Sequence, residues 1–274
     1  MVRSLLLFHS LFICLQSGFA QHAAGGCGPA HRDSLLKQYT TGWTDVRDYN
    51  SKAWQLHFDS LIAICPNIAE AYQLKALPFI KYGDYAMAMP LEDKAVALDP
   101  SQYLAYRAFL KCIFTKDYEG ALVDFQRAEK LFPGRFEMDH SYFFYEGLCY
   151  FSLNKYKLAE AAFKKDIFAQ TNGDPKKKAH FNSLLYAGIL YYAMKNNQQA
   201  KYYLLQCLEQ YKMLPYANYY LAKVYQREKN KGMSDKYLML AKAGFEAKYS
   251  LNEANEFYVH YPFIPTANAP DPEF

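Results

Sequence analysis

The sequence of 274 residues has little charge bias, and its apolar runs are short. Its 31 basic and 27 acidic residues leave a formal net charge of +4 at pH 7. That basic bias is too weak to favour nucleic acid as the main partner. The apolar run from Leu5 to Leu15 is shorter than a helix needs to cross a bilayer. We therefore expect no nucleic-acid partner and no transmembrane segment in the mature chain.

The common catalytic and nucleotide-binding motifs are missing as well. The sequence contains no G-x-S-x-G, no H-E-x-x-H, no P-loop and no G-x-G-x-x-G that opens a helix after a strand. His140 and His180 begin predicted helices, where a surface or terminal role is ordinary. Asp124 and Glu129 are expected on helix surfaces, without a paired acid and base. We therefore predict that the chain has no catalytic residue, binds no cofactor and is not an enzyme.

Cysteine is scarce, and its spacing is not that of a disulfide framework. Apart from Cys14, five cysteines remain, an odd number with no C-x-x-C pair, so at least one stays free or pairs between chains. Most are expected to be small core residues. A metal site made of His22, Cys27 and His31 is a weak alternative, because these residues lie in a glycine-rich stretch with no fourth ligand. A lipid anchor on Cys27 is a second weak alternative. We predict no metal and leave the pairing open.

The first twenty residues have the layout of a secretory signal peptide. Arg3 forms a short positive region, the apolar run follows, and Gly18 and Ala20 place small residues before a cut at Gln21. The chain is therefore predicted to be exported, to a periplasmic or secreted destination.

Aromatic residues and internal repetition dominate the rest of the chain. There are 26 Tyr and 20 Phe but only 2 Trp, a composition that suits much half-buried surface. Five stretches share an aromatic-rich segment, a short polar turn and a segment with a small residue near its start. Taking one anchor residue in each turn, the steps between anchors are 33, 38, 41 and 34 residues. The anchors are Gly83, Lys116, Asn154, Lys195 and Lys229.

The residues around these turns follow a known repeat pattern. In the third unit Gly147 and Tyr150 fit G-x2-Y, and Ala159 and Phe163 fit A-x3-F, so the sequence resembles the tetratricopeptide repeat. The other units keep parts of this pattern, with Gly188, Tyr191 and Ala200 in the fourth, Ala121, Phe125 and Pro133 in the second, Tyr72 and Ala76 in the first, and Ala222 and Tyr225 in the fifth. The resemblance implies an all-α fold, a right-handed superhelical solenoid of helix-turn-helix repeats. Small residues let two helices approach closely, and stacked neighbours bury each hairpin's apolar face.

The chain divides into five predicted regions. They are a signal peptide (1–20), a flexible N-terminal segment (21–32), a degenerate repeat or N-terminal helical cap (33–66), five tetratricopeptide-like repeats (67–249), and a short helix with a C-terminal tail (250–274). The first repeat departs from the pattern, because Glu92 replaces Phe and because Pro78 and Pro90 lie inside its helices. We expect the tail to pack back as a cap; the sharper alternative is that it occupies the groove and competes with ligand.

In this family the first helix of each repeat lines a concave groove. By resemblance, twelve positions line it here: Gln73, Leu77, Tyr106, Phe144, Leu148, Phe151, Leu185, Ile189, Tyr192, Tyr216, Tyr219 and Lys223. The set is mostly apolar and aromatic, and lacks most of the Lys and Asn of the subclass that grips chaperone C-termini. The plain alternative is that about half of these rings fill inter-helix core.

The resemblance predicts a non-catalytic protein- or peptide-binding scaffold that uses this groove in an exported compartment. Two alternatives remain. A structural or self-associating subunit of an envelope assembly would form oligomers without added ligand. A small-ligand-binding protein or hydrolase would hold a deep pocket with perturbed titratable groups.

Overall fold

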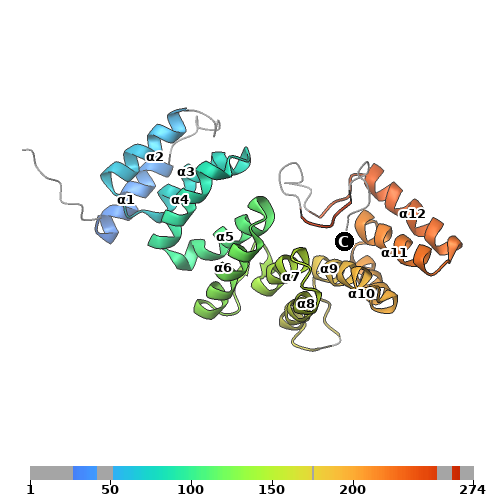
Figure 1. Ribbon diagram of the computed structural model, residues 1–274. Coiled ribbons are helices and arrows are strands. Elements are labelled where there is room, and N and C mark those ends of the chain that lie inside the picture. The colour runs from blue at the N-terminus through green and yellow to red at the C-terminus, as the bar shows by residue number, and fades with distance from the viewer. Residues whose placement is uncertain (1–26, 42–51, 175, 252–260, 266–274) are drawn as a thin grey trace, which may run out of the picture.

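The computed structural model describes residues 27–41, 52–174, 176–251 and 261–265. The predicted signal peptide and the short helix expected after Leu251 lie outside these ranges. The helices follow one another along the chain, and Figure 1 shows them stacked side by side into an arch. They are α1 Pro29–Thr40, α2 Lys52–Ile64, α3 Ala69–Lys81, α4 Tyr85–Leu98, α5 Pro100–Leu110, α6 Tyr118–Leu131, α7 Tyr142–Ser152, α8 Tyr156–Thr171, α9 Phe181–Ala193, α10 Asn197–Gln210, α11 Pro215–Arg227 and α12 Lys231–Glu246.

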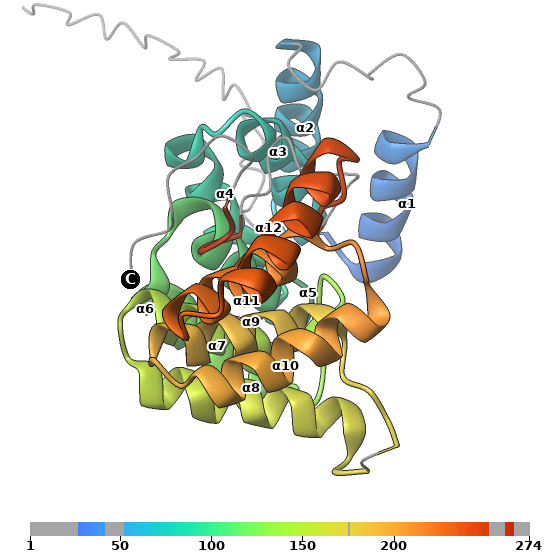
Figure 2. The ribbon, with the colours of Figure 1, turned by 90° about the vertical axis from the view of Figure 1, so that its right-hand side faces the viewer.

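Consecutive helices pair as antiparallel hairpins. Each of the pairs α3–α4, α5–α6, α7–α8, α9–α10 and α11–α12 encloses one of the five anchor turns, and each hairpin packs on the next. Figure 2 views the arch from its C-terminal end, with α11 and α12 in front. The predicted all-α solenoid of helix-turn-helix repeats is therefore confirmed. The hairpins stack because no single hairpin buries its apolar face without its neighbours.

The anchor turns share one backbone geometry. Gly83 has φ 78°, and the four other anchors have φ between 56° and 60°, all in the left-handed region that ends a helix. In four of the five turns the next residue caps the second helix, its side chain accepting a backbone N–H. These four caps are Asp84, Asp117, Asn196 and Asn230. The repeated turn chemistry therefore fixes where each second helix starts.

Glycine is required where two helices meet most closely. A Cβ on Gly147 would lie 2.5–2.8 Å from the ring of Phe163, and one on Gly188 would lie 2.6 Å from Cγ of Leu204. Real side chains do not approach so closely, so these positions admit only hydrogen. Both pairs belong to the repeat pattern read from the sequence.

Two irregular features were not predicted. The first helix of the second repeat ends in a π-helical turn, Lys111–Thr115. The 38-residue step holds a small antiparallel pair of strands, β1 Phe136–Glu137 and β2 His140–Ser141, whose connecting residues Met138 and Asp139 both have positive φ. This β-turn projects between α6 and α7.

The N-terminal end is more ordered than predicted. Helix α1 begins at Pro29, so the expectation of a flexible segment through residue 32 is wrong for residues 29–32. Proline at the first helical position sets φ in advance. A disulfide joins Cys27 to Cys65, and the side chain of Asn67 bonds both the backbone N–H and the C=O of Cys27 at 3.0 Å. These contacts fasten α1 to the end of α2.

The disulfide gives a direct prediction about thiols. Cys112, Cys149 and Cys207 are buried and free. The chain cut before Gln21 should therefore take up three alkyl groups when denatured without reductant, and five after reduction, as counted by mass spectrometry. The bond closes a loop of 38 residues. In the chain-entropy account, closing such a loop restricts the unfolded chain and so stabilises the folded state by about 4 kcal/mol. Reduction in native buffer should expose α1 to protease first. Five labels without reductant would contradict the assignment.

None of the helices that the structure describes combines the length and the apolar character needed to cross a membrane.

Candidate functional site: the concave groove

The first helices of the repeats line the inner side of the arch (Figure 1). This groove has two parts. Its N-terminal part, which we call the open half, lies over α1, α3, α5 and the β1–β2 turn and contains a cavity of about 660 Å³. Its C-terminal part, the filled half, lies over α7, α9 and α11. It is occupied by residues Tyr261–Pro265 of the same chain, which we call the groove segment.

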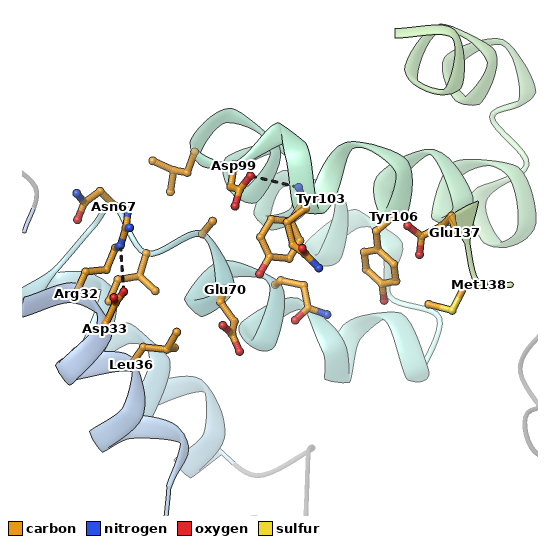
Figure 3. A pocket seen from close by; sticks show the side chains of 15 residues that line it. Arg32, Asp33, Leu36, Asn67, Glu70, Asp99, Tyr103, Tyr106, Glu137 and Met138 are labelled. Atoms are coloured by element: carbon orange, nitrogen blue, oxygen red, sulfur yellow. Dashed lines mark hydrogen bonds and ion pairs between the residues drawn. The ribbon is translucent and has the colours of Figure 1, made fainter. Parts of the chain in front are cut away.

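The cavity of the open half has an acidic rim. Asp33, Glu70, Asp99 and Glu137 line it together with Arg32, whose Nε lies 3.8 Å from Oδ1 of Asp33 (Figure 3). One of these carboxylates has a structural task, because Oδ1 of Asp99 accepts the backbone N–H groups of residues 101 and 102 at the start of α5. Burial raises the pKa of Glu137 to about 7.

Two tyrosines stand in the middle of this cavity. Tyr103 and Tyr106 project from α5, as Figure 3 shows. Burial raises the pKa of Tyr103, and the nearby carboxylates of Glu70 and Asp99 raise it further. The open half therefore offers aromatic surface in a negative field.

A second cavity of about 430 Å³ joins the two halves of the groove. Its lining includes Leu77 of α3, Tyr106 and Phe109 of α5, His140 of β2 and Tyr261 of the groove segment. Because Tyr106 borders both cavities and Tyr261 borders the second, the groove is continuous from α1 to the groove segment.

The groove segment is held by ring contacts in the filled half. The ring of Phe263 stacks on Phe151 with centroids 4.0 Å apart and an interplanar angle of 23°. Tyr261 lies among Phe144 and Tyr186, with centroid distances of 6.5 and 6.3 Å. The Tyr261 ring therefore contacts the first helices of the third and fourth repeats, and the Phe263 ring contacts that of the third.

Buried tyrosine hydroxyls hold the backbone of the same segment. Tyr186 donates to the carbonyl of Pro262 at 2.8 Å, and Tyr220 donates to the carbonyl of Phe263 at 2.6 Å. Both donor tyrosines are fully buried, and burial raises the pKa of Tyr186 well above its ordinary value. The hydroxyl of Tyr145 on α7 donates instead to the carbonyl of Glu137 at 3.1 Å. The described residues Tyr261–Pro265 of the predicted tail therefore pack back against α7, α9 and α11 on the groove side.

The predicted groove positions fall into two groups. Six are half-buried: Gln73, Leu77 and Tyr106 at the open half, and Tyr192, Tyr219 and Lys223 on α9 and α11. Six are buried: Phe144, Leu148, Phe151, Leu185, Ile189 and Tyr216. Of the buried six, Phe144 and Phe151 contact the groove segment directly.

Sequence reasoning missed Tyr186 and Tyr220, which bond the groove segment, and Tyr145, which occupies the same repeat position in α7. A signal for them existed. They are 41 and 34 residues apart, the same steps as the anchors of their repeats, so tyrosine recurs at one repeat position in three consecutive first helices. The expected groove positions Leu185 and Tyr219 each lie one residue before a bonding tyrosine, whereas Phe144 and Phe151 contact the segment with their rings.

Several titratable residues lie in the core rather than on the surface. Asp124 is buried, where its oxygens accept from Arg107 Nη2 at 2.7 Å and Lys111 Nζ at 2.8 Å, so its expected surface position is wrong. His140, for which a surface or terminal role was expected, is buried in β2 just before α7, and burial lowers its pKa to about 3. The long-range stacking of hairpins covers both residues.

A polar network links the third and fourth repeats. Ser141 donates to Oδ1 of Asp166 at 2.7 Å, and Gln170 donates to the same oxygen at 2.9 Å and to Ser183 at 2.8 Å. Asp166 is fully buried, and burial raises its pKa. These bonds satisfy Oδ1 of Asp166, whereas its Oδ2 is buried with no hydrogen-bond partner among the described residues.

The metal reading does not hold for the described residues. Cys27 is bonded to Cys65 and so cannot ligate a metal with His31, while His22 lies outside the described ranges. Among the residues that the structure describes, no three His, Cys, Asp or Glu side chains gather as metal ligands.

The sequence comparisons give no match, whereas the structural comparisons do. No protein-family model matches the chain, and no curated protein sequence matches it significantly. The crystal structure of PilW, a type IV pilus biogenesis factor, superposes with a TM-score of 0.58 at 15% identity, covering 83% of this chain and 97% of that one.

Two further solved structures show the same similarity. PilF of Pseudomonas aeruginosa gives a TM-score of 0.57 at 19% identity, covering 83% of this chain and 98% of that chain. The Cut9–Hcn1 assembly of the APC/C gives 0.54 at 16% identity, covering 74% of this chain and 38% of that one. At these identities the similarity establishes the fold alone, a solenoid of tetratricopeptide repeats.

Proposed function

We propose that this tetratricopeptide-repeat solenoid is a non-catalytic scaffold that binds an extended protein or peptide segment along its concave groove. One observation carries the proposal: the groove already holds a short segment of its own chain, Tyr261–Pro265. Two of the bonds that hold this segment go to backbone carbonyls of Pro262 and Phe263, which every peptide offers. The cavities of about 660 and 430 Å³ continue the same groove toward α1.

The environments of the buried titratable groups support a non-catalytic role. Asp124 is paired with two cations, Asp166 accepts hydrogen bonds from Ser141 and Gln170, and His140 is kept neutral by burial. Burial in such structural positions also shifts pKa values, as at Asp166 and His140.

Export to an oxidising compartment is part of the proposal. Its support is the leader-like layout of residues 1–20 together with the Cys27–Cys65 disulfide. Disulfides persist in periplasmic and secreted proteins and are rare in the cytosol.

Site-directed photo-crosslinking tests the groove assignment. A photoreactive phenylalanine analogue replaces Tyr106 in the open half, or Tyr202, which is 57% exposed on α10, as the matched control. Each variant is made with its leader in the native host and irradiated. We expect the Tyr106 variant to form one recurrent adduct that the Tyr202 variant lacks, because the groove presents concave surface to an extended chain.

Mutation of the same region provides a second check. Leu77→Glu should abolish the adduct formed from position 106 while the circular dichroism of the chain stays helical, since Leu77 lines the adjoining cavity. Equal adducts from positions 106 and 202, or adducts only with a second copy of the chain, would favour the self-associating subunit instead.

A further inference from the structure

The groove segment points to the chemistry of the partner. Building on the proposed function, we propose that the filled half is a specific site for an uncharged segment with the pattern aromatic–proline–aromatic–aliphatic. Tyr261–Pro265 is its resident occupant, and a partner segment of the same chemistry displaces it.

The ring contacts define the side-chain part of this specificity. Phe263 stacks on Phe151, and Tyr261 inserts beside Phe144 and Tyr186. All three receiving side chains are aromatic and at most 1% exposed. A charged side chain at either position would lose its hydration against these rings, which costs free energy without a compensating bond. The site therefore selects rings at the first and third positions of the segment.

The tyrosine hydroxyls define the main-chain part. If the segment leaves, the Tyr186 and Tyr220 hydroxyls lose the carbonyls of Pro262 and Phe263. A buried donor without an acceptor is costly, so the site favours an occupant that supplies two successive carbonyls. Proline at the second position suits this role, because it offers a carbonyl and brings no N–H that would be buried unsatisfied.

The backbone of the resident segment carries strain. Phe263 has φ 59°, in the left-handed region that bulky residues rarely adopt, and it follows the proline of a turn. Such a conformation persists where the surrounding contacts over-determine it, as the stacked ring and the bonded carbonyl do here. The resident segment is thus held less tightly than its contacts alone would allow, which makes exchange with a free segment feasible.

Covalent attachment favours the resident segment over a free peptide, because it raises the local concentration of the segment at the site. A short connection to the body of the protein gives an effective concentration in the millimolar range. A free peptide therefore competes poorly with the resident segment until the resident is weakened. This predicts a larger apparent affinity for peptide when only the resident segment is changed.

The test is peptide binding to the full chain. The probe is a fluorescently labelled, end-capped peptide Tyr-Pro-Phe-Ile-Pro, followed by anisotropy. We expect Phe263→Ala to bind it at least about tenfold more tightly than the wild type, because removing the resident anchor raises the fraction of empty sites. The peptide with Ala in place of Phe should not bind. Phe168→Ala, whose ring is 62% exposed on α8, is the matched control and should bind as the wild type does.

Two outcomes would overturn the proposal. If Phe263→Ala binds the peptide no more tightly than the wild type, the segment is a permanent structural cap. A second measurement does not depend on that variant folding: the same peptide, with a photoreactive analogue in place of Phe, is crosslinked to wild-type protein. We expect the label in α7, α9 or α11, and a label elsewhere would refute the site. The adduct from position 106 reports on the open half, so the two proposals fail separately.

Discussion

Replacing Asp124 with alanine should lower the free energy of unfolding by about 3 kcal/mol, within the range measured when one partner of a buried ion pair is removed. Asp124 accepts from both Arg107 and Lys111, whose side chains are only 14% and 18% exposed. Without the carboxylate, two cations stay largely buried beside each other and lose their shared acceptor. Urea denaturation followed by circular dichroism measures the change.

The same cluster contains a matched control. Asp93 also bonds Arg107, at 2.7 Å, but its side chain is 59% exposed. Asp93→Ala should cost at most about 1 kcal/mol, because solvent screens exposed ion pairs. Equal effects of the two substitutions would show that burial of Asp124 contributes nothing to stability.

Replacing Glu92 with glutamine should make the protein more stable at alkaline pH and change its pH dependence. Glu92 is fully buried in α4, and neither carboxyl oxygen has a hydrogen-bond partner in the described part of the chain. Burial raises its pKa to about 8; Arg107 lowers the pKa and Asp93 raises it. The folded protein therefore keeps this carboxyl protonated at neutral pH, whereas the unfolded chain loses the proton near the ordinary value of 4.5.

The sign of the effect follows from proton binding. Between about pH 4.5 and 8 the folded state binds more protons at Glu92 than the unfolded state, so stability falls as pH rises. The slope approaches about 1.4 kcal/mol per pH unit. Glutamine carries no proton to lose, so the stability gained in Glu92→Gln should grow from pH 5 to pH 9.

Thermal denaturation of both proteins across this pH range measures the difference. Glu137 and Glu146, whose pKa values burial raises to about 7, add a slope of the same sign, and His140 adds the opposite sign below its unfolded pKa of 6.5. These contributions are common to both proteins and cancel in the comparison. Glu119→Gln, at an exposed position of α6, should leave the curve unchanged. A constant difference between Glu92→Gln and the wild type would refute the protonated state.

The sequence alone determined the repeating part of the fold. The anchors Gly83, Lys116, Asn154, Lys195 and Lys229 all adopt the left-handed conformation that ends a first helix. The glycines of the repeat pattern lie where a methyl group would clash with the facing helix. Both features depend on residues a few positions apart or on one hairpin, so a periodic sequence records them directly.

Other features lay beyond the reach of local patterns. The sequence already placed Pro78 and Pro90 inside helices of the first repeat, as α3 and α4 have them. The burial of the Glu92 carboxyl was not predicted, because it depends on the packing of helices around it. The pairing of Cys27 with Cys65 arises from the packing of α1 on α2, which cysteine spacing does not encode. The β1–β2 strands were not predicted, because two residues per strand are too few to show an alternating pattern in the sequence.

The state of the groove was decided by tertiary structure alone. The sequence indicated which helices line it, and a tyrosine recurring at one repeat position marks Tyr145, Tyr186 and Tyr220. Only the packed arch shows that the hydroxyls of Tyr186 and Tyr220 meet the carbonyls of Pro262 and Phe263, which lie 76 and 43 positions further along the chain. Contacts at such separations follow from how the hairpins stack, because stacking sets the curvature that brings the groove and the C-terminal segment together.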